Sequence, residues 1–121
     1  MKFSDYFSNN FETRDDHMYE TLRTHYYRAR LDEAKKEVLD LIEREKGKII
    51  DDNEKYSEIY YETPSYNCTV TLIATTPVEI AIDFRVTTYN FISFGKGKKV
   101  IEKLYKDLDS KLSYKGISLY K

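Results

Sequence analysis

The 121-residue sequence has a single cysteine, no tryptophan and no long hydrophobic run. The lone Cys68 excludes an internal disulfide and a cysteine-based zinc site, and it is compatible with a reducing cytoplasm. No apolar segment approaches the roughly 18 residues that a membrane-spanning helix needs. The first residues also lack the continuous apolar core of a secretory signal peptide. We therefore expect a cytoplasmic protein with no membrane partner.

Strong net charge is absent too, because 20 basic residues face 21 acidic ones. This balance argues against tight nonspecific binding to nucleic acid by the whole chain. The charge is unevenly spread, however, since residues 91–121 hold eight basic and three acidic side chains. A basic region beside Tyr56, Tyr60 and Tyr61 has the composition of a surface for single-stranded nucleic acid. No RNP-type string accompanies it, so nucleic-acid binding is kept only as an alternative.

The most regular pattern predicts two strands, over residues 66–74 and 78–89. Even-numbered positions from 78 to 86 are apolar, and the odd-numbered positions between them are mostly polar. This period of two is typical of a strand with one buried face and one solvated face. We expect the charged side chains of this strand to lie on the solvated face.

The register of this hairpin follows from the same pattern. Pairing Ala74 with Val78 places apolar residues opposite one another along both strands. A two-residue turn would instead set Val70 against Asp83 and bury a carboxylate. We therefore predict a connection of three or five residues. Pro77 favours five, because it cannot adopt the positive φ of a common three-residue loop.

Helical periodicity marks two other segments. One helix is predicted over residues 30–46, and its apolar stripe consists of Leu31, Ala34, Val38, Leu41 and Ile42. A second follows residue 98 and closes at 115–116, with Val100, Ile101, Leu104, Tyr105, Leu108 and Leu112 on one face. Further strands are predicted at 21–28, 48–52 and 56–62. Residues 21–28 have a competing interpretation as the start of the first helix.

These elements predict an α+β fold in two layers. A mainly antiparallel sheet of about five strands, in the order β-α-β-β-β-β-α, would carry both helices on its apolar face. Residues 21–121 would form this single domain. Residues 1–20 would form an arm or short helix that docks its aromatic residues, which are Phe3, Tyr6, Phe7 and Phe11.

Two groups of residues are candidate binding sites. Asp83, Arg85, Glu58 and Tyr60 would form a polar patch on the solvated face, suited to a polar ligand or a partner. Charges on such a face are also routine and contribute less than about 1 kcal/mol per pair.

The other group is Gly95, Lys96, Gly97 and Lys98, which precede the second helix. A loop at a helix N-terminus attracts anions, although the Walker spacing is absent and a flexible, solubilising turn is the simpler interpretation.

The two histidines are candidate catalytic or metal-binding residues. His17 follows Asp15 and Asp16, a string that could orient a general base or contribute to a metal site. No second cluster of ligands accompanies it, so we predict a solvated His17 and a His25 on the polar face of a strand. We expect no catalytic residue, no metal and no cofactor.

The chain after residue 21 contains four strings that, in this order, carry a resemblance to a family: LRTHYY, KYSEIYYE, VEIAIDFRVTT and VIEKLYKDLD. It resembles small cytosolic proteins of unknown function from Gram-positive bacteria. The resemblance favours a strand at residues 21–28. It includes no catalytic motif and implies no activity, cofactor or site.

The leading functional hypothesis is a noncatalytic binding or protein-interaction module. Its contact surface would be the polar sheet face, an edge strand or the aromatic arm, and an edge could pair two copies into a homodimer. The alternative is a small-ligand carrier or enzyme with a tyrosine-lined pocket between sheet and helices. A histidine within hydrogen-bond reach of a carboxylate in a deep pocket would favour the enzyme.

Overall fold

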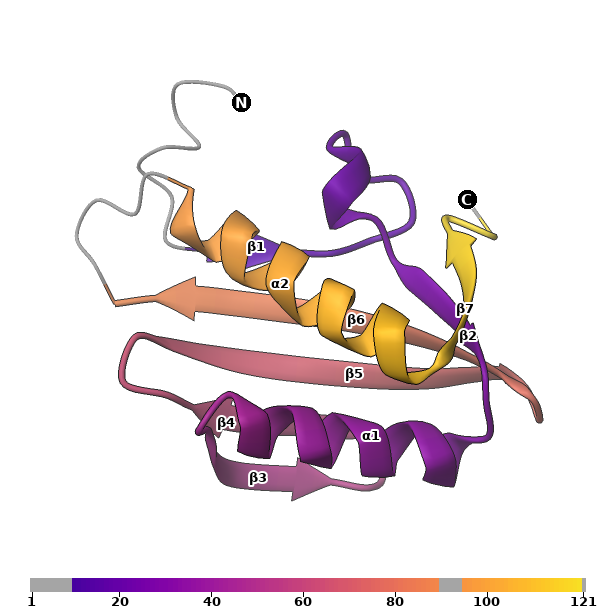
Figure 1. Cartoon of the computed structure of the whole chain (residues 1–121), viewed down its shortest axis with the longest axis horizontal. Helices are drawn as coiled ribbons and strands as arrows, with labels where there is room; N and C mark the ends of the chain where they lie inside the picture. Colours follow the sequence, from indigo (N-terminus) through magenta and orange to yellow (C-terminus); the bar gives the residue numbers. More distant parts are fainter. Residues whose placement is uncertain (1–9, 90–94, 121) are drawn as a thin grey trace.

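A computed structural model describes residues 10–89 and 95–120. Its elements are β1 (Asn10–Glu12), the 3₁₀ turn η2 (Glu20–Leu22), β2 (His25–Arg28), α1 (Leu31–Arg44), β3 (Lys48–Asn53), β4 (Glu58–Glu62), β5 (Tyr66–Thr76), β6 (Glu79–Thr88), α2 (Lys96–Lys111) and β7 (Ser113–Ile117). The strands form one antiparallel sheet in the order β3-β4-β5-β6-β2-β7, and β1 also pairs with β6. Both helices lie over one face of this sheet (Figure 1).

The α+β class and the single helical layer are therefore confirmed, while the sheet is larger than expected. Seven strands are present in the described chain, against about five predicted. The two additional ones are β1, in the segment expected to be an arm, and β7, in the segment expected to be a tail. Both are short and mostly polar, so neither shows the alternation by which longer strands are recognised.

The core lies between the helices and the apolar face of β6. Ile80, Ile82, Phe84 and Val86 are at most 1% exposed. The helical side chains that cover the sheet are also buried, namely Ala34, Val38, Leu41 and Ile42 of α1 and Ile101, Leu104, Tyr105 and Leu108 of α2. Val78 was expected in this set but is 56% exposed, because it belongs to the turn and not to the strand.

The β5–β6 connection differs from the prediction in an instructive way. Ala74 pairs with Ile80 and not with Val78, so residues 75–79 separate these partners, which is the favoured length of five. Within this connection Thr76 pairs with Glu79, and Pro77 and Val78 form a two-residue turn. A bulge between Ala74 and Thr76 adds one residue to β5. This extra residue restores the alternation that a two-residue turn would otherwise invert, so the apolar faces still coincide.

Glu79 was predicted on the solvated face but is only 3% exposed. Its carboxylate accepts hydrogen bonds from Lys115 Nζ, Thr75 Oγ1 (2.6 Å) and Tyr120 OH (2.5 Å). These bonds, with Lys115 first, hold the pKa of Glu79 down at about 2. The carboxylate thereby fixes β7 and the residues after it to the start of β6.

We predict that Glu79→Gln destabilises the protein at neutral pH. Because the folded pKa lies below the ordinary value of 4.5, ionised Glu79 stabilises the fold above that value. The difference between wild type and variant should therefore shrink as pH falls from about 4.5 towards 2. Urea unfolding across this pH series measures the difference, with Glu62→Gln, at an exposed position of β4, as the control. A difference that is independent of pH would contradict the assigned role.

Helix α2 begins earlier than expected, and this changes the predicted loop. Only Gly95 precedes it, as the N-cap with a φ of 79°, while Lys96 to Lys98 form its first turn. Gly97 is buried against Phe11 of β1, and a Cβ at Gly97 would lie 2.7 Å from Phe11 Cδ2. Phe11 thus docks on the domain, whereas Phe3, Tyr6 and Phe7 lie outside the described residues.

This contact predicts a change of sign in a double-mutant cycle. Gly97→Ala alone should cost about 1–3 kcal/mol, because the added methyl group overlaps the Phe11 ring. In a Phe11→Ala background the same substitution should stabilise by up to about 1 kcal/mol, since alanine favours a helix. Urea unfolding of the four proteins gives the coupling. Equal effects in both backgrounds would show that Phe11 does not restrict Gly97.

Candidate functional site

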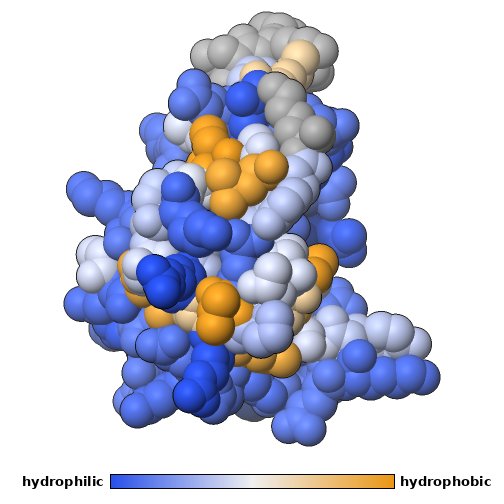
Figure 2. Space-filling view, turned by 90° about the vertical axis from the view of Figure 1, so that its right-hand side faces the viewer, coloured by the Kyte–Doolittle hydropathy of each residue, from blue (hydrophilic) through white to orange (hydrophobic). Residues whose placement is uncertain are grey.

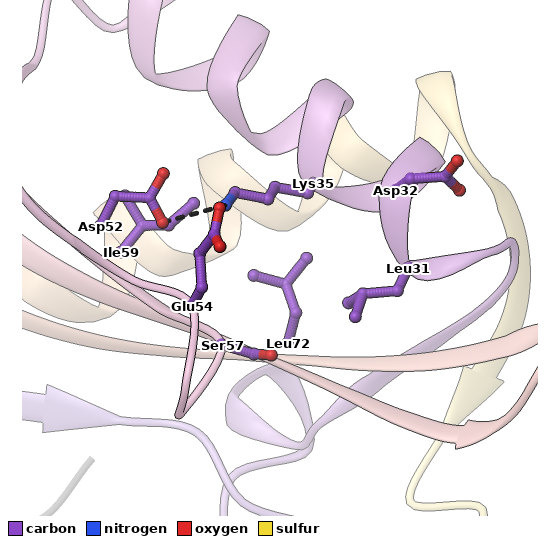
Figure 3. A pocket seen from close by; sticks show the side chains of 8 residues that line it. All are labelled: Leu31, Asp32, Lys35, Asp52, Glu54, Ser57, Ile59 and Leu72. Carbon is purple, nitrogen blue, oxygen red and sulfur yellow. Dashed lines mark ion pairs between the residues drawn. The ribbon is translucent and has the colours of Figure 1, made fainter.

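A groove of about 530 Å³ lies between α1 and the β3–β4 hairpin (Figure 3). We call it the α1 groove. Its lining residues come from four elements and one turn: Leu31, Asp32 and Lys35 of α1, Asp52 of β3, Glu54 and Ser57 of the turn, Ile59 of β4 and Leu72 of β5.

The walls of the α1 groove are aliphatic. Ile59 and Leu72 are 1% and 3% exposed and continue the core, whereas Leu31 at the start of α1 is 39% exposed. Figure 3 shows the side chains of Leu31 and Leu72 directed towards the same space. The backbone carbonyl of Ser57 accepts the N–H of Leu72 at 3.0 Å, which fixes the β3–β4 turn against β5. The groove therefore has an apolar floor held by backbone contacts.

One end of the groove is charged. Lys35 Nζ lies 3.0 Å from Asp52 Oδ1 and 3.5 Å from Glu54 Oε1, and so connects α1 to the hairpin. The hydrogen bond to Asp52 raises the pKa of Lys35 and outweighs its partial desolvation. Glu54 is largely exposed, and pairs of this kind contribute little to stability. Their effect is to place two carboxylates and one ammonium beside an apolar space.

Sequence reasoning did not identify this groove. Leu31 was assigned to the buried stripe, and Asp52 and Glu54 to a strand end and a turn. The lining residues are distant in sequence and meet only because α1 lies over the strands that follow it. The one available signal was Leu31 itself, a leucine at the very first position of the helix.

The structure brings together most of the predicted polar patch. Glu58, Asp83 and Arg85 line a depression of about 190 Å³ with Glu12, Thr13, Thr69, Thr71 and Phe84. Tyr60 is not among these residues, and its hydroxyl lies 3.3 Å from Glu62 Oε2 as a donor. Arg85 Nε donates to Glu12 Oε2 at 3.3 Å. A binding role for this patch stays a prediction.

Within the patch, the Asp83 carboxylate is held by hydrogen bonds from two threonines. Its Oδ1 accepts hydrogen bonds from the hydroxyls of Thr13 and Thr24, each at 2.6 Å. These two threonines stand at the ends of the connection from β1 to β2. Burial raises the pKa of Asp83, and the nearby Asp15 and Glu12 raise it further. Asp83 therefore closes this connection at an electrostatic cost.

We predict opposite effects for two substitutions of Asp83. Asp83→Asn keeps an acceptor for both hydroxyls and removes a half-buried charge, so at pH 7 it should be at least as stable as wild type. This advantage should shrink on acidification, as wild-type Asp83 becomes protonated. Asp83→Ala should cost about 2–4 kcal/mol, because two buried hydroxyls lose their acceptor. Urea unfolding measures both, and equal losses would contradict the role of the acceptor.

His25 does not lie on a polar face, contrary to the prediction. It is 9% exposed, and its ring stacks on Tyr105 of α2 at 3.6 Å and 4°. Its Nδ1 lies 2.9 Å from Asp109 Oδ1, an atom that also accepts a 2.6 Å hydrogen bond from Tyr27 OH. The adjoining depression is about 220 Å³. A carboxylate orients the imidazole as in acid–base sites, but this carboxylate is shared and the ring is packed against α2.

Other sequence candidates have ordinary surroundings. His17 is half-buried, and its Nδ1 accepts the N–H of Tyr19 at 3.0 Å. Cys68 is fully buried, and burial raises the pKa of its thiol to about 12. Among residues 10–89 and 95–120, no cluster of three histidine, cysteine, aspartate or glutamate side chains could hold a metal ion.

The basic C-terminal region is partly neutralised. Lys98 pairs with Glu102 at 2.8 Å, Lys103 pairs with Glu45 at 2.9 Å, and Lys115 pairs with Glu79. Lys96 to Lys98 belong to a helix and not to the predicted anion-binding loop. These pairs weaken the positive potential on which contact with phosphate depends.

β3 lies at one end of the sheet, so its outer edge has no neighbouring strand among the described residues. Lys48 to Asp52 are all exposed, including Ile49 at 42% and Ile50 at 49%. A bulge between Ile49 and Asp51 interrupts its regular geometry, a feature that commonly limits pairing between edges. The homodimer stays a prediction.

Within the part of the chain that is described, no helix has the length and apolar character required to cross a bilayer. Comparison of the sequence and the structure with protein-family models, curated proteins and solved structures gave no match. The resemblance to small proteins of Gram-positive bacteria therefore stays a prediction.

Proposed function

We propose that this protein is a noncatalytic binding module that holds a small, largely apolar ligand in the α1 groove. The observation that carries this proposal is a groove of about 530 Å³ with an aliphatic floor and a charged end. Small-molecule sites typically measure about 300–1,000 Å³ and combine apolar walls with a few polar groups. The position between a helix and the sheet agrees with the carrier hypothesis.

The composition of the groove supports binding without catalysis. Its lining contains no histidine, cysteine or tyrosine, and Lys35 is engaged by two carboxylates. Ser57 has no general base of the histidine type among these residues to activate it. The buried tyrosines Tyr27, Tyr61 and Tyr105 fill the core, so aliphatic residues take the place of the expected tyrosine lining.

The face shown in Figure 2 favours a small occupant over a broad protein interface. On the side shown in Figure 2, hydrophobic residues appear as small groups separated by hydrophilic ones. Protein-binding surfaces more often present one continuous apolar patch. A ligand that enters a groove needs only the local apolar area that Leu31, Ile59 and Leu72 provide.

We predict that the uncharged fluorescent probe N-phenyl-1-naphthylamine binds the α1 groove. Leu31→Glu should weaken its affinity roughly five- to tenfold, because one apolar wall is lost and a charge replaces it. The helix should tolerate this change, since an acidic residue in the first turn favours its dipole. Fluorescence titration measures the affinity.

Met18→Glu is the matched control, because Met18 is 57% exposed and does not line the groove. It should leave the affinity unchanged. Absence of saturable binding by the wild-type protein would refute the proposed function, and equal affinity for wild type and Leu31→Glu would place the probe elsewhere.

A further inference from the structure

We infer that the ligand of the α1 groove carries a protonated amine next to its apolar part. This inference rests on the proposed function and specifies the ligand class. It follows from the charges that surround the groove and from the way in which the protein's own Lys35 is held there.

The charge of the lining is negative. Asp32, Asp52 and Glu54 supply three carboxylates, whereas Lys35 supplies one ammonium group. At the charged end, Lys35 Nζ lies within 3.5 Å of both Asp52 and Glu54. Two carboxylates that share one ammonium leave a net negative charge, and a second ammonium would balance it.

Lys35 also shows where an ammonium group is accommodated. Its aliphatic stem extends along the groove from α1, and its Nζ ends between the two carboxylates (Figure 3). A ligand amine could join this arrangement or replace Lys35, which is 28% exposed and can move out to solvent. The apolar part of the same ligand would then lie against Leu31 and Leu72.

The N-terminus of α1, which lies beside the groove, does not make an anionic ligand more favourable than an amine. A helix N-terminus attracts anions through its free amides. In α1, however, Glu33 Oε1 accepts the N–H of Arg30 at 3.4 Å, and Asp32 Oδ1 accepts the N–H of Glu33 at 2.9 Å. Acidic side chains of the protein already occupy this position, so an anionic ligand would meet carboxylates.

Three probes of equal chain length test the inference, namely octylammonium, octan-1-ol and octanoate. Each displaces N-phenyl-1-naphthylamine from the wild-type protein at neutral pH and low salt. Octylammonium should bind about two- to fivefold more tightly than the other two, which is the range expected of one exposed ion pair. The preference should diminish at high salt, because screening weakens contacts between exposed charges.

A double variant locates the effect. Asp52→Asn with Glu54→Gln should abolish the preference for octylammonium while N-phenyl-1-naphthylamine still binds. Asp16→Asn with Glu62→Gln removes the same number of exposed charges without touching the groove and should keep the preference.

The outcomes separate the inference from the proposed function. Equal displacement by octylammonium and octan-1-ol, or tighter binding of octanoate, would overturn the amine assignment and leave an apolar site. A preference that survives the Asp52 and Glu54 substitutions would also overturn it. Failure of N-phenyl-1-naphthylamine to bind at all would refute the site itself.

Discussion

The burial of Ile80, Ile82 and Phe84 beneath two helices is the constraint on which the structure depends. Each such side chain contributes about 1.5–3 kcal/mol when it is fully removed from water. The stripes of α1 and α2 supply the covering surface, and Figure 1 shows the two helices side by side over the sheet. The strands on either side of β6 widen the sheet, while the core stays between β6 and the two helices.

The two acidic residues of β6 organise the segments that lie outside this centre. Asp83 joins Thr13 and Thr24, the two ends of the connection between β1 and β2. Glu79 joins Lys115 and Tyr120, which belong to β7 and the segment after it. A central strand thus uses its hydrophobic face to build the core and its acidic side chains to fix the chain on both sides.

The α1 groove is a consequence of how α1 begins. Ala34 and the later stripe residues are buried, while Leu31, one turn earlier, is left partly exposed. The β3–β4 turn lies beside the first turn of α1, and Lys35 connects the helix to Asp52 and Glu54. The same amphipathic helix therefore serves both parts, since its C-terminal turns complete the core and its first turn forms a wall of the proposed binding site.

The sequence by itself determined the α+β class, both helices, the β5–β6 hairpin and the helical covering of the apolar face. These features follow from periodicity, which is a local property of the chain. Only the tertiary structure decided the turn and register of the hairpin, because the bulge at Thr75 corrects the alternation in a way that no pattern encodes. Long-range packing also decided the burial of Glu79, His25 and Gly97. Their partners Lys115, Asp109 and Phe11 lie 36, 84 and 86 residues away in the chain, and such contacts exist only after folding.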